Sequence, residues 1–116
     1  MGWDLEKNKP EITSMWTIIN PKQASNSRHI HANNFISAAY YLKAPANCGN
    51  IAFYDPRSAK VIKTPKISKP NNLNSDVFNI EPKEGLLVLF PSYIHHSVAM
   101  NLSDEDRIVI SFNVNL

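Results

Sequence analysis

The sequence has one cysteine, no long apolar run and little net charge, and each of these absences narrows the class of protein. Cys48 stands alone, so no internal disulfide can form, which fits a reducing compartment and leads us to expect a cytoplasmic protein. No apolar run reaches the roughly 18 residues of a membrane span, and the polar segment 1–9 does not resemble a secretory signal peptide. A formal net charge of +2 is too small to indicate a nucleic-acid partner.

Helical periodicity and internal repeats are also missing, and short strand-like segments take their place. We expect one domain over residues 1–116, with residues 1–13 as a polar lead-in, because the chain can form one hydrophobic core and no more. Segments rich in β-branched and aromatic residues alternate with turn signals roughly every 8–12 residues, which indicates an all-β sandwich or barrel, and we favour a jelly roll. The expected strands are 14–20, 29–31, 35–44, 50–54, 59–64, 77–80, 86–90, 94–100 and 107–114.

The segment Leu86–Phe90 is a continuous apolar run with no polar residue for solvent to contact. Such a run, bounded by turn signals, is typical of a strand that is buried in the protein. We therefore expect this strand to lie in the interior.

Four histidines stand in two pairs, and the first pair has a spacing that suits a metal site. Residues i and i+2 of a strand point to the same face, so His29 and His31 would project together, about 6–7 Å apart along the chain. Two imidazoles at that spacing reach one metal ion, although an isolated pair of this kind is more often two surface histidines.

The second pair, His95 and His96, is adjacent in the sequence, so its two side chains would face opposite sides of a strand. Only one of them can join the first pair. Ile94 and Val98 share the face of His96, whereas Ser97 lies on the same side as His95. Periodicity alone leaves the choice between the two histidines open.

An arginine opens the last predicted strand, eleven residues after His96. One face of that strand is apolar and carries Ile108, Ile110 and Phe112. The other face carries Arg107, Val109, Ser111 and Asn113. A guanidinium on the more polar face suits a buried carboxylate, because it binds that group bidentately. A solvated charge at a sheet edge is the plainer alternative.

Five motifs taken together resemble a family of 2-oxoglutarate- and Fe(II)-dependent oxygenases. The family pattern is roughly H-x-H, SGxYYL, FxDPR, GxLxxFPSWxxHxV and RxSxSFN. The matching segments are His29–His31, Ser37–Leu42, Phe53–Arg57, Gly85–Val98 and Arg107–Asn113. The resemblance runs from about Trp16 to Asn113, and its last two segments are the most specific part.

The resemblance implies a double-stranded β-helix, a cupin-like jelly roll, with Fe(II) at its mouth. It implies that His29, His31 and His96 are the metal ligands and that Arg107 binds 2-oxoglutarate, all four being catalytic. The serine expected two residues after the arginine is Val109 here, so a hydroxyl of Tyr41 or Ser111 would support the co-substrate carboxylate. Asn113 would orient a neighbouring group.

The same resemblance implies a reaction with O2 that hydroxylates an unidentified small-molecule or peptide substrate. The usual ligand set for such iron sites is two histidines and one carboxylate. In this sequence the carboxylate position falls on His31, and the nearest conceivable carboxylate replacement is Asp55.

Other readings of the sequence remain open. A cupin-like metal oxygenase without 2-oxoglutarate is favoured by the all-histidine ligand set and opposed by Arg107. A third possibility is a jelly roll that only binds carbohydrate or a partner protein, which would need neither a metal ion nor 2-oxoglutarate. Lysines at 60, 63, 66 and 69 could line a nucleic-acid groove, but a solvated charged loop is the commoner explanation. A homodimer that covers an exposed sheet is a further expectation for so small a chain.

Overall fold

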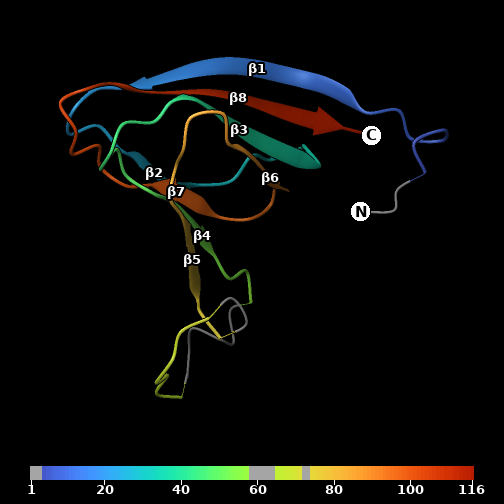
Figure 1. Cartoon of the computed structure of the whole chain (residues 1–116). Helices are drawn as coiled ribbons and strands as arrows, with labels where there is room; N and C mark the ends of the chain where they lie inside the picture. Colours follow the sequence, from blue (N-terminus) through green and yellow to red (C-terminus); the bar gives the residue numbers. More distant parts are fainter. Residues whose placement is uncertain (1–3, 58–64, 72–73) are drawn as a thin grey trace.

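The protein is an all-β molecule, as its sequence predicts. The computed structural model describes residues 4–57, 65–71 and 74–116, and no helix occurs among them (Figure 1). The strands are β1 (Glu11–Asn20), β2 (Asn26–His29), β3 (Ile36–Lys43), β4 (Ile51–Tyr54), β5 (Val77–Ile80), β6 (Leu87–Pro91), β7 (His96–Val98) and β8 (Arg107–Asn115). The strand expected over residues 59–64 lies outside the described residues. Among those described, no helix has the length and apolar character needed to cross a membrane.

The strands form two antiparallel sheets of four. The major sheet has the order β1-β8-β3-β6 and the minor sheet the order β2-β7-β4-β5 (Figure 1). The chain passes from one sheet to the other at every connection except the one that joins β4 to β5. This alternation is the topology of a jelly roll, so the predicted architecture is confirmed.

The strand β8 shows how the sequence pattern divides between core and surface. Its buried residues alternate with half-buried ones, and the buried set is Arg107, Val109, Ser111 and Asn113. The more polar face of this strand therefore turns toward the interior. An apolar cluster of Ala39, Tyr41, Ile51, Val88, Phe90 and Val109 packs around it between the two sheets.

The prediction of a buried strand over Leu86–Phe90 is only half right. In β6 the side chains of Val88 and Phe90 are buried, but Leu87 and Leu89 are 47% and 51% exposed. Among the described strands, β6 is an edge strand that pairs with β3 only, and one of its faces points away from the interior. Because successive side chains alternate, a strand with one uncovered face exposes every second residue, whatever its polarity.

The bounds of β2 also differ from the prediction. This strand begins at Asn26, inside a segment expected to be a loop, and ends at His29. His31 therefore lies beyond the strand and not on it. The lead-in around Asp4 is a turn, in which the Asp4 carboxylate accepts hydrogen bonds from the backbone N–H groups of Glu6 (3.1 Å) and Lys7 (3.3 Å).

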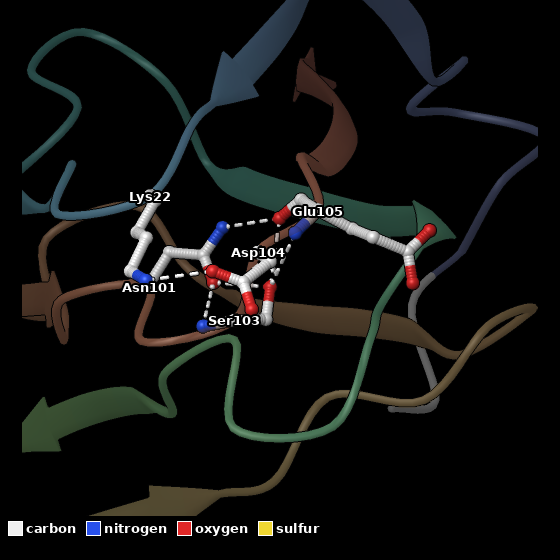
Figure 2. Close-up of polar contacts among 5 residues, drawn as sticks. All are labelled: Lys22, Asn101, Ser103, Asp104 and Glu105. Atoms are coloured by element: carbon white, nitrogen blue, oxygen red, sulfur yellow. Dashed lines mark hydrogen bonds and ion pairs between the residues drawn. The ribbon is translucent and has the colours of Figure 1, made fainter.

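A buried asparagine holds the loop that precedes β8. Asn101 is fully buried, and its Nδ2 donates to the carbonyl oxygens of Asn20 (3.0 Å) and Glu105 (2.8 Å). Its Oδ1 accepts from the backbone N–H (2.9 Å) and the hydroxyl (2.8 Å) of Ser103 (Figure 2). These bonds tie the end of β1 to the turn that delivers Arg107 into the interior.

We expect Asn101→Ala to lower the free energy of unfolding by about 1–3 kcal/mol, because it leaves buried carbonyl and N–H groups unsatisfied. Urea unfolding followed by circular dichroism measures the change. Asn79→Ala, at an exposed position of β5, is the matched control and should change stability by less than about 0.5 kcal/mol. Equal effects of the two substitutions would contradict a specific role for Asn101.

Candidate metal centre and its cavity

Three histidines from two segments of the chain meet in the cavity between the sheets. His29 ends β2 and His96 begins β7, and the two are paired across these strands. His31 lies two residues beyond β2 and completes the group, in which one ring nitrogen of each residue lies within 4.8 Å of the others. The backbone N–H of His31 donates to the carbonyl oxygen of Ser92 (3.0 Å), which fixes this segment after β2 has ended. The two-residue spacing thus brings His29 and His31 together, although a single strand does not hold both.

Hydrogen bonds orient all three imidazoles in the same sense. The Nδ1 atom of His29 is 2.7 Å from the carbonyl oxygen of Ser27, and that of His96 is 3.1 Å from the carbonyl oxygen of Ile94. A carbonyl oxygen accepts only, so it places the proton on Nδ1 and leaves Nε2 with a free lone pair. Each of these rings therefore presents a metal-binding nitrogen on its far side.

His31 is oriented by a buried polar network. Its Nδ1 lies 2.9 Å from Asn113 Oδ1 and 2.8 Å from Ser37 Oγ, and the Ser37 hydroxyl donates to the same Asn113 oxygen (2.8 Å). Ser92 Oγ lies 2.7 Å from Ser37 Oγ, and Asn113 Nδ2 donates to Ser14 Oγ (3.0 Å). The network keeps the proton of His31 on Nδ1, as the main-chain carbonyls do for the other two rings.

Two members of this network, Ser37 and Ser92, escaped the sequence reasoning. Both are fully buried. A usable signal was present, because Ser37 stands two and four residues before Ala39 and Tyr41, and so shares their inward face on β3. A serine on the buried face of an otherwise apolar strand needs a polar partner.

The spacing of the free nitrogens suits a metal ion. The Nε2 atoms of His29 and His31 are 3.2 Å apart. Two nitrogens bound to one ion at roughly 2.1 Å lie about 3.0–3.4 Å apart for ligand angles between octahedral and tetrahedral. Burial lowers the pKa of His96 to about 4 and also lowers the pKa of His31, so both rings are neutral at neutral pH, as metal ligands must be.

The structure separates the adjacent histidines. His96 is only 4% exposed and belongs to the cluster, whereas His95 is exposed. Asp55 takes no part either, because its carboxylate forms an ion pair with Arg57 (2.7 Å). Among the residues that the structure describes, the group able to hold a metal contains histidines only.

A cavity of about 250 Å³ extends between the sheets from the histidine cluster. Its lining includes Trp16, Tyr41, Arg107 and Ser111 together with the three histidines, and no Asp or Glu among the described residues lines it. The Trp16 ring, 36% exposed, meets His31 edge-on at 5.6 Å between ring centres. The cavity thus joins a metal-binding corner to a basic one, with an aromatic wall beside the metal corner.

Arg107 forms the basic corner and is fully buried. Its Nη1 donates to the carbonyl oxygens of Cys48 and Ala99, the latter at 3.1 Å. Its Nε and Nη2 are buried and have no hydrogen-bond partner among the described residues. Burial lowers the pKa of the guanidinium from its usual value, but the group stays protonated at neutral pH. The free Nε–Nη2 edge is the one that binds a carboxylate through two parallel hydrogen bonds.

The backbone at Gly49 makes this arrangement of carbonyls possible. Gly49 has a φ of +91°, and a Cβ at this position would overlap the carbonyl oxygen of Ala99. Only glycine lets the two segments approach so closely. The carbonyls of Cys48 and Ala99 can then converge on one nitrogen of Arg107.

The other predicted co-substrate residues lie on the same cavity wall. Tyr41 is 1% exposed, and burial raises the pKa of its hydroxyl to about 12, so it remains a hydrogen-bond donor at neutral pH. Ser111 is also buried and lines the cavity. Val109 lies between Arg107 and Ser111 on the inward face of β8 and presents an apolar surface.

An antiparallel jelly roll with a histidine cluster and a buried arginine in one cavity defines a class of metal-dependent oxygenases, and the comparisons identify the family. A family model described as "Putative 2OG-Fe(II) oxygenase" matches residues 14–113. The chain therefore belongs to this family of 2-oxoglutarate- and Fe(II)-dependent oxygenases. No curated protein sequence matches the chain.

Solved structures share the fold at low sequence identity. An oxidoreductase of the 2OG-Fe(II) oxygenase family from Burkholderia pseudomallei matches with a TM-score of 0.72 and 12% identity over 94% of this chain and 46% of its own. A Pseudomonas putida prolyl-4-hydroxylase gives 0.61 and 18% over 87% and 51%. HygX from Streptomyces hygroscopicus, with nickel and 2-oxoglutarate bound, gives 0.61 and 10% over 94% and 59%. The double-stranded β-helix is thus confirmed, and the chain spans about half the length of these proteins.

We expect the purified, metal-free protein to bind one Ni²⁺ or Zn²⁺ ion per chain. His96→Ala should weaken this binding by more than about 100-fold, because it removes a buried ligand from a group of three. Isothermal titration calorimetry measures the affinity, and His95→Ala is the matched control that should leave it unchanged. A similar loss in both variants would show that the adjacent histidines act as a surface pair.

We expect Asn113→Leu to weaken metal binding by about 10–100-fold while leaving all three imidazoles in the protein, because His31 loses the acceptor that holds its proton on Nδ1. Nitrogen-15 NMR of the imidazoles reports this directly as a loss of the single Nδ1–H tautomer of His31. Unchanged metal affinity in a folded variant would contradict the orienting role of Asn113.

Proposed function

We propose that His29, His31 and His96 hold Fe(II) in this chain and that Arg107 binds the far carboxylate of 2-oxoglutarate. One observation carries the proposal: a single cavity is lined by three clustered imidazoles and by a buried guanidinium whose Nε and Nη2 have no partner among the described residues. A metal ion would bind to the imidazoles, and one carboxylate of the co-substrate would pair with the guanidinium.

The charges in the cavity support a dianionic co-substrate. Three neutral imidazoles add no negative charge to a divalent ion, and no carboxylate among the described residues lines the cavity. A buried guanidinium without a counter-ion is costly. A 2-oxo dicarboxylate supplies one negative charge at the metal and one at Arg107, and so compensates both positive groups.

The residues around the cavity divide the work of binding and orientation. The Ser27 and Ile94 carbonyls and Asn113 keep the ligand nitrogens deprotonated and aimed inward. Arg107 orients the co-substrate by its far end, and the Tyr41 hydroxyl is a donor for the same carboxylate in the place of the serine that Val109 replaces. Iron with bound 2-oxoglutarate supplies the oxidising chemistry, in which O2 is consumed, the co-substrate becomes succinate and CO2, and one oxygen atom enters a substrate C–H bond.

The proposed outcome is hydroxylation of a small molecule or a peptide side chain. Trp16, which is 36% exposed, would offer such a substrate an apolar wall beside His31. We assign residues 1–116 to one jelly-roll domain. The single cysteine, Cys48, is buried and free, which suits a reducing compartment, and we propose the cytoplasm.

The experiment is to load the protein with Fe(II) under anaerobic conditions and to titrate it with 2-oxoglutarate. We expect the weak visible absorption of the metal chelate in the native protein and none in His96→Ala. Arg107→Met, which keeps the length of the side chain but removes its charge, should retain iron and lose 2-oxoglutarate affinity by about 10–100-fold, the loss of a charge-assisted bidentate pair. His95→Ala should behave as the native protein does.

A native protein that holds iron yet shows no chelate band would refute the assignment of 2-oxoglutarate. The all-histidine ligand set would then favour a cupin-like metal oxygenase that uses no 2-oxoglutarate. Release of succinate on admission of O2, dependent on added 2-oxoglutarate, separates these two functions. A protein that binds no metal at all would be a binding module instead.

A further inference from the structure

Asn20, the last residue of β1, brings a buried amide to the cavity that the proposed function does not use. The residue is 6% exposed, and its Oδ1 is buried without a hydrogen-bond partner among the described residues. Within the described lining of the cavity, the other buried side-chain atoms in this state are Nε and Nη2 of Arg107. Buried polar groups almost always have a partner. An amide left without one inside a cavity therefore indicates a ligand.

Strand pairing places Asn20 directly beside Arg107. Three inward-facing residues of β1 lie opposite three of β8: Trp16 opposite Ser111, Ile18 opposite Val109, and Asn20 opposite Arg107. All of them line the cavity. Residues that face each other across antiparallel strands have Cβ atoms about 4.5–5.5 Å apart. A ligand on the free edge of the guanidinium is therefore within reach of the Asn20 amide.

The main chain of Asn20 is held in this position by a neighbouring loop. Its carbonyl oxygen accepts a hydrogen bond from Nδ2 of the fully buried Asn101 (3.0 Å). A half-turn about the last bond of an asparagine side chain exchanges Oδ1 and Nδ2 in nearly the same volume. Asn20 can therefore present an N–H group to an anion that is bound at Arg107.

The neutral amide leaves the charge of Arg107 available to a ligand. Arg107 is the only Arg, Lys, Asp or Glu among the described residues that line the cavity. An aspartate in the place of Asn20 would have almost the same size and shape, but its carboxylate would compete for the guanidinium edge that a ligand carboxylate needs. Asparagine supplies a hydrogen-bond donor without neutralising the cation.

We propose that Asn20 binds the far carboxylate of the co-substrate together with Arg107, and that it thereby selects 2-oxo acids that end in a carboxylate. This inference rests on the proposed function, from which it takes the identity of the co-substrate. Nε and Nη2 of Arg107 donate to the two carboxylate oxygens, and the amide N–H donates to one of them. Tyr41 lies on β3, the other neighbour of β8. The carboxylate thus has a donor on each side of Arg107.

The test compares two ligands that differ only at the far end. 2-Oxopentanoate has the carbon chain and the 2-oxo acid group of 2-oxoglutarate but ends in a methyl group, so it can chelate a metal without pairing with Arg107. Isothermal titration calorimetry of the Ni²⁺-loaded protein measures both affinities and requires no turnover. The native protein should bind 2-oxoglutarate more tightly than 2-oxopentanoate.

Asn20→Leu should weaken the binding of 2-oxoglutarate by about 10- to 100-fold, as expected for the loss of a hydrogen bond to a charged group. The affinity for 2-oxopentanoate should not change. Asn20→Asp should weaken the binding of 2-oxoglutarate by at least about 100-fold, because its carboxylate occupies the free edge of Arg107 and repels the ligand. Asn79→Leu and Asn79→Asp, at an exposed position of β5, are the matched controls and should leave both affinities unchanged.

Two results would overturn the role of Asn20 alone. One is a native affinity for 2-oxoglutarate in both Asn20 variants, and the other is an equal loss of both ligands, which would indicate a distorted site. A native protein that holds Ni²⁺ but does not bind 2-oxoglutarate would refute the proposed function, and this inference with it. Circular dichroism verifies the fold of each variant. Asn20→Asp keeps the size of the side chain, so it decides the outcome if Asn20→Leu fails to fold.

Discussion

The structure around the cavity depends on the burial of a cation, Arg107, with no carboxylate beside it among the described residues. Carbonyl oxygens of Cys48 and Ala99 solvate one of its nitrogens, and the close approach at Gly49 brings them into place. The remaining edge of the guanidinium has no partner in the described part of the chain. A buried charge held this way is costly without an opposite charge beside it, and the proposed co-substrate carboxylate would supply that charge. The polar face of β8 turns inward with Arg107, and Asn113 on the same face finds hydrogen-bond partners there.

Protein groups orient every imidazole of the histidine cluster. Each histidine of the cluster has an oxygen at its Nδ1, supplied by a neighbouring carbonyl in two cases and by Asn113 in the third. These oxygens determine that Nδ1 carries the proton, so the free lone pairs are on the Nε2 atoms. Among the described residues, neither the cluster nor the groups that orient it include a carboxylate. The site therefore has one negative charge fewer than the usual set of two histidines and one carboxylate. A bound co-substrate would then compensate a larger share of the positive charge of the metal ion.

Several parts of the fold were predictable because they follow from local chemistry. β5 has the predicted bounds, and β3, β4 and β8 differ from theirs by a residue or so, because apolar alternation and turn residues mark them. The environment of Leu87 and Leu89 was not predictable in this way. A continuous apolar run indicates burial of both faces, but whether a covering layer exists is a property of the assembled molecule. The position of His31 was not predictable from local pattern either, because this residue joins the cluster from beyond the end of β2.

The sequence by itself determined the all-β class, the family resemblance and the residue types available to the site, because strand periodicity and motif spacing are properties of neighbours in the chain. The tertiary structure alone decided which residues meet. It buried His96 and left His95 exposed, and it joined Asn113, Ser37 and Ser92 to His31. It also left one edge of Arg107 without a partner among the residues that the structure describes. These are contacts between segments far apart in sequence, and they depend on strand order and register, which no local pattern encodes.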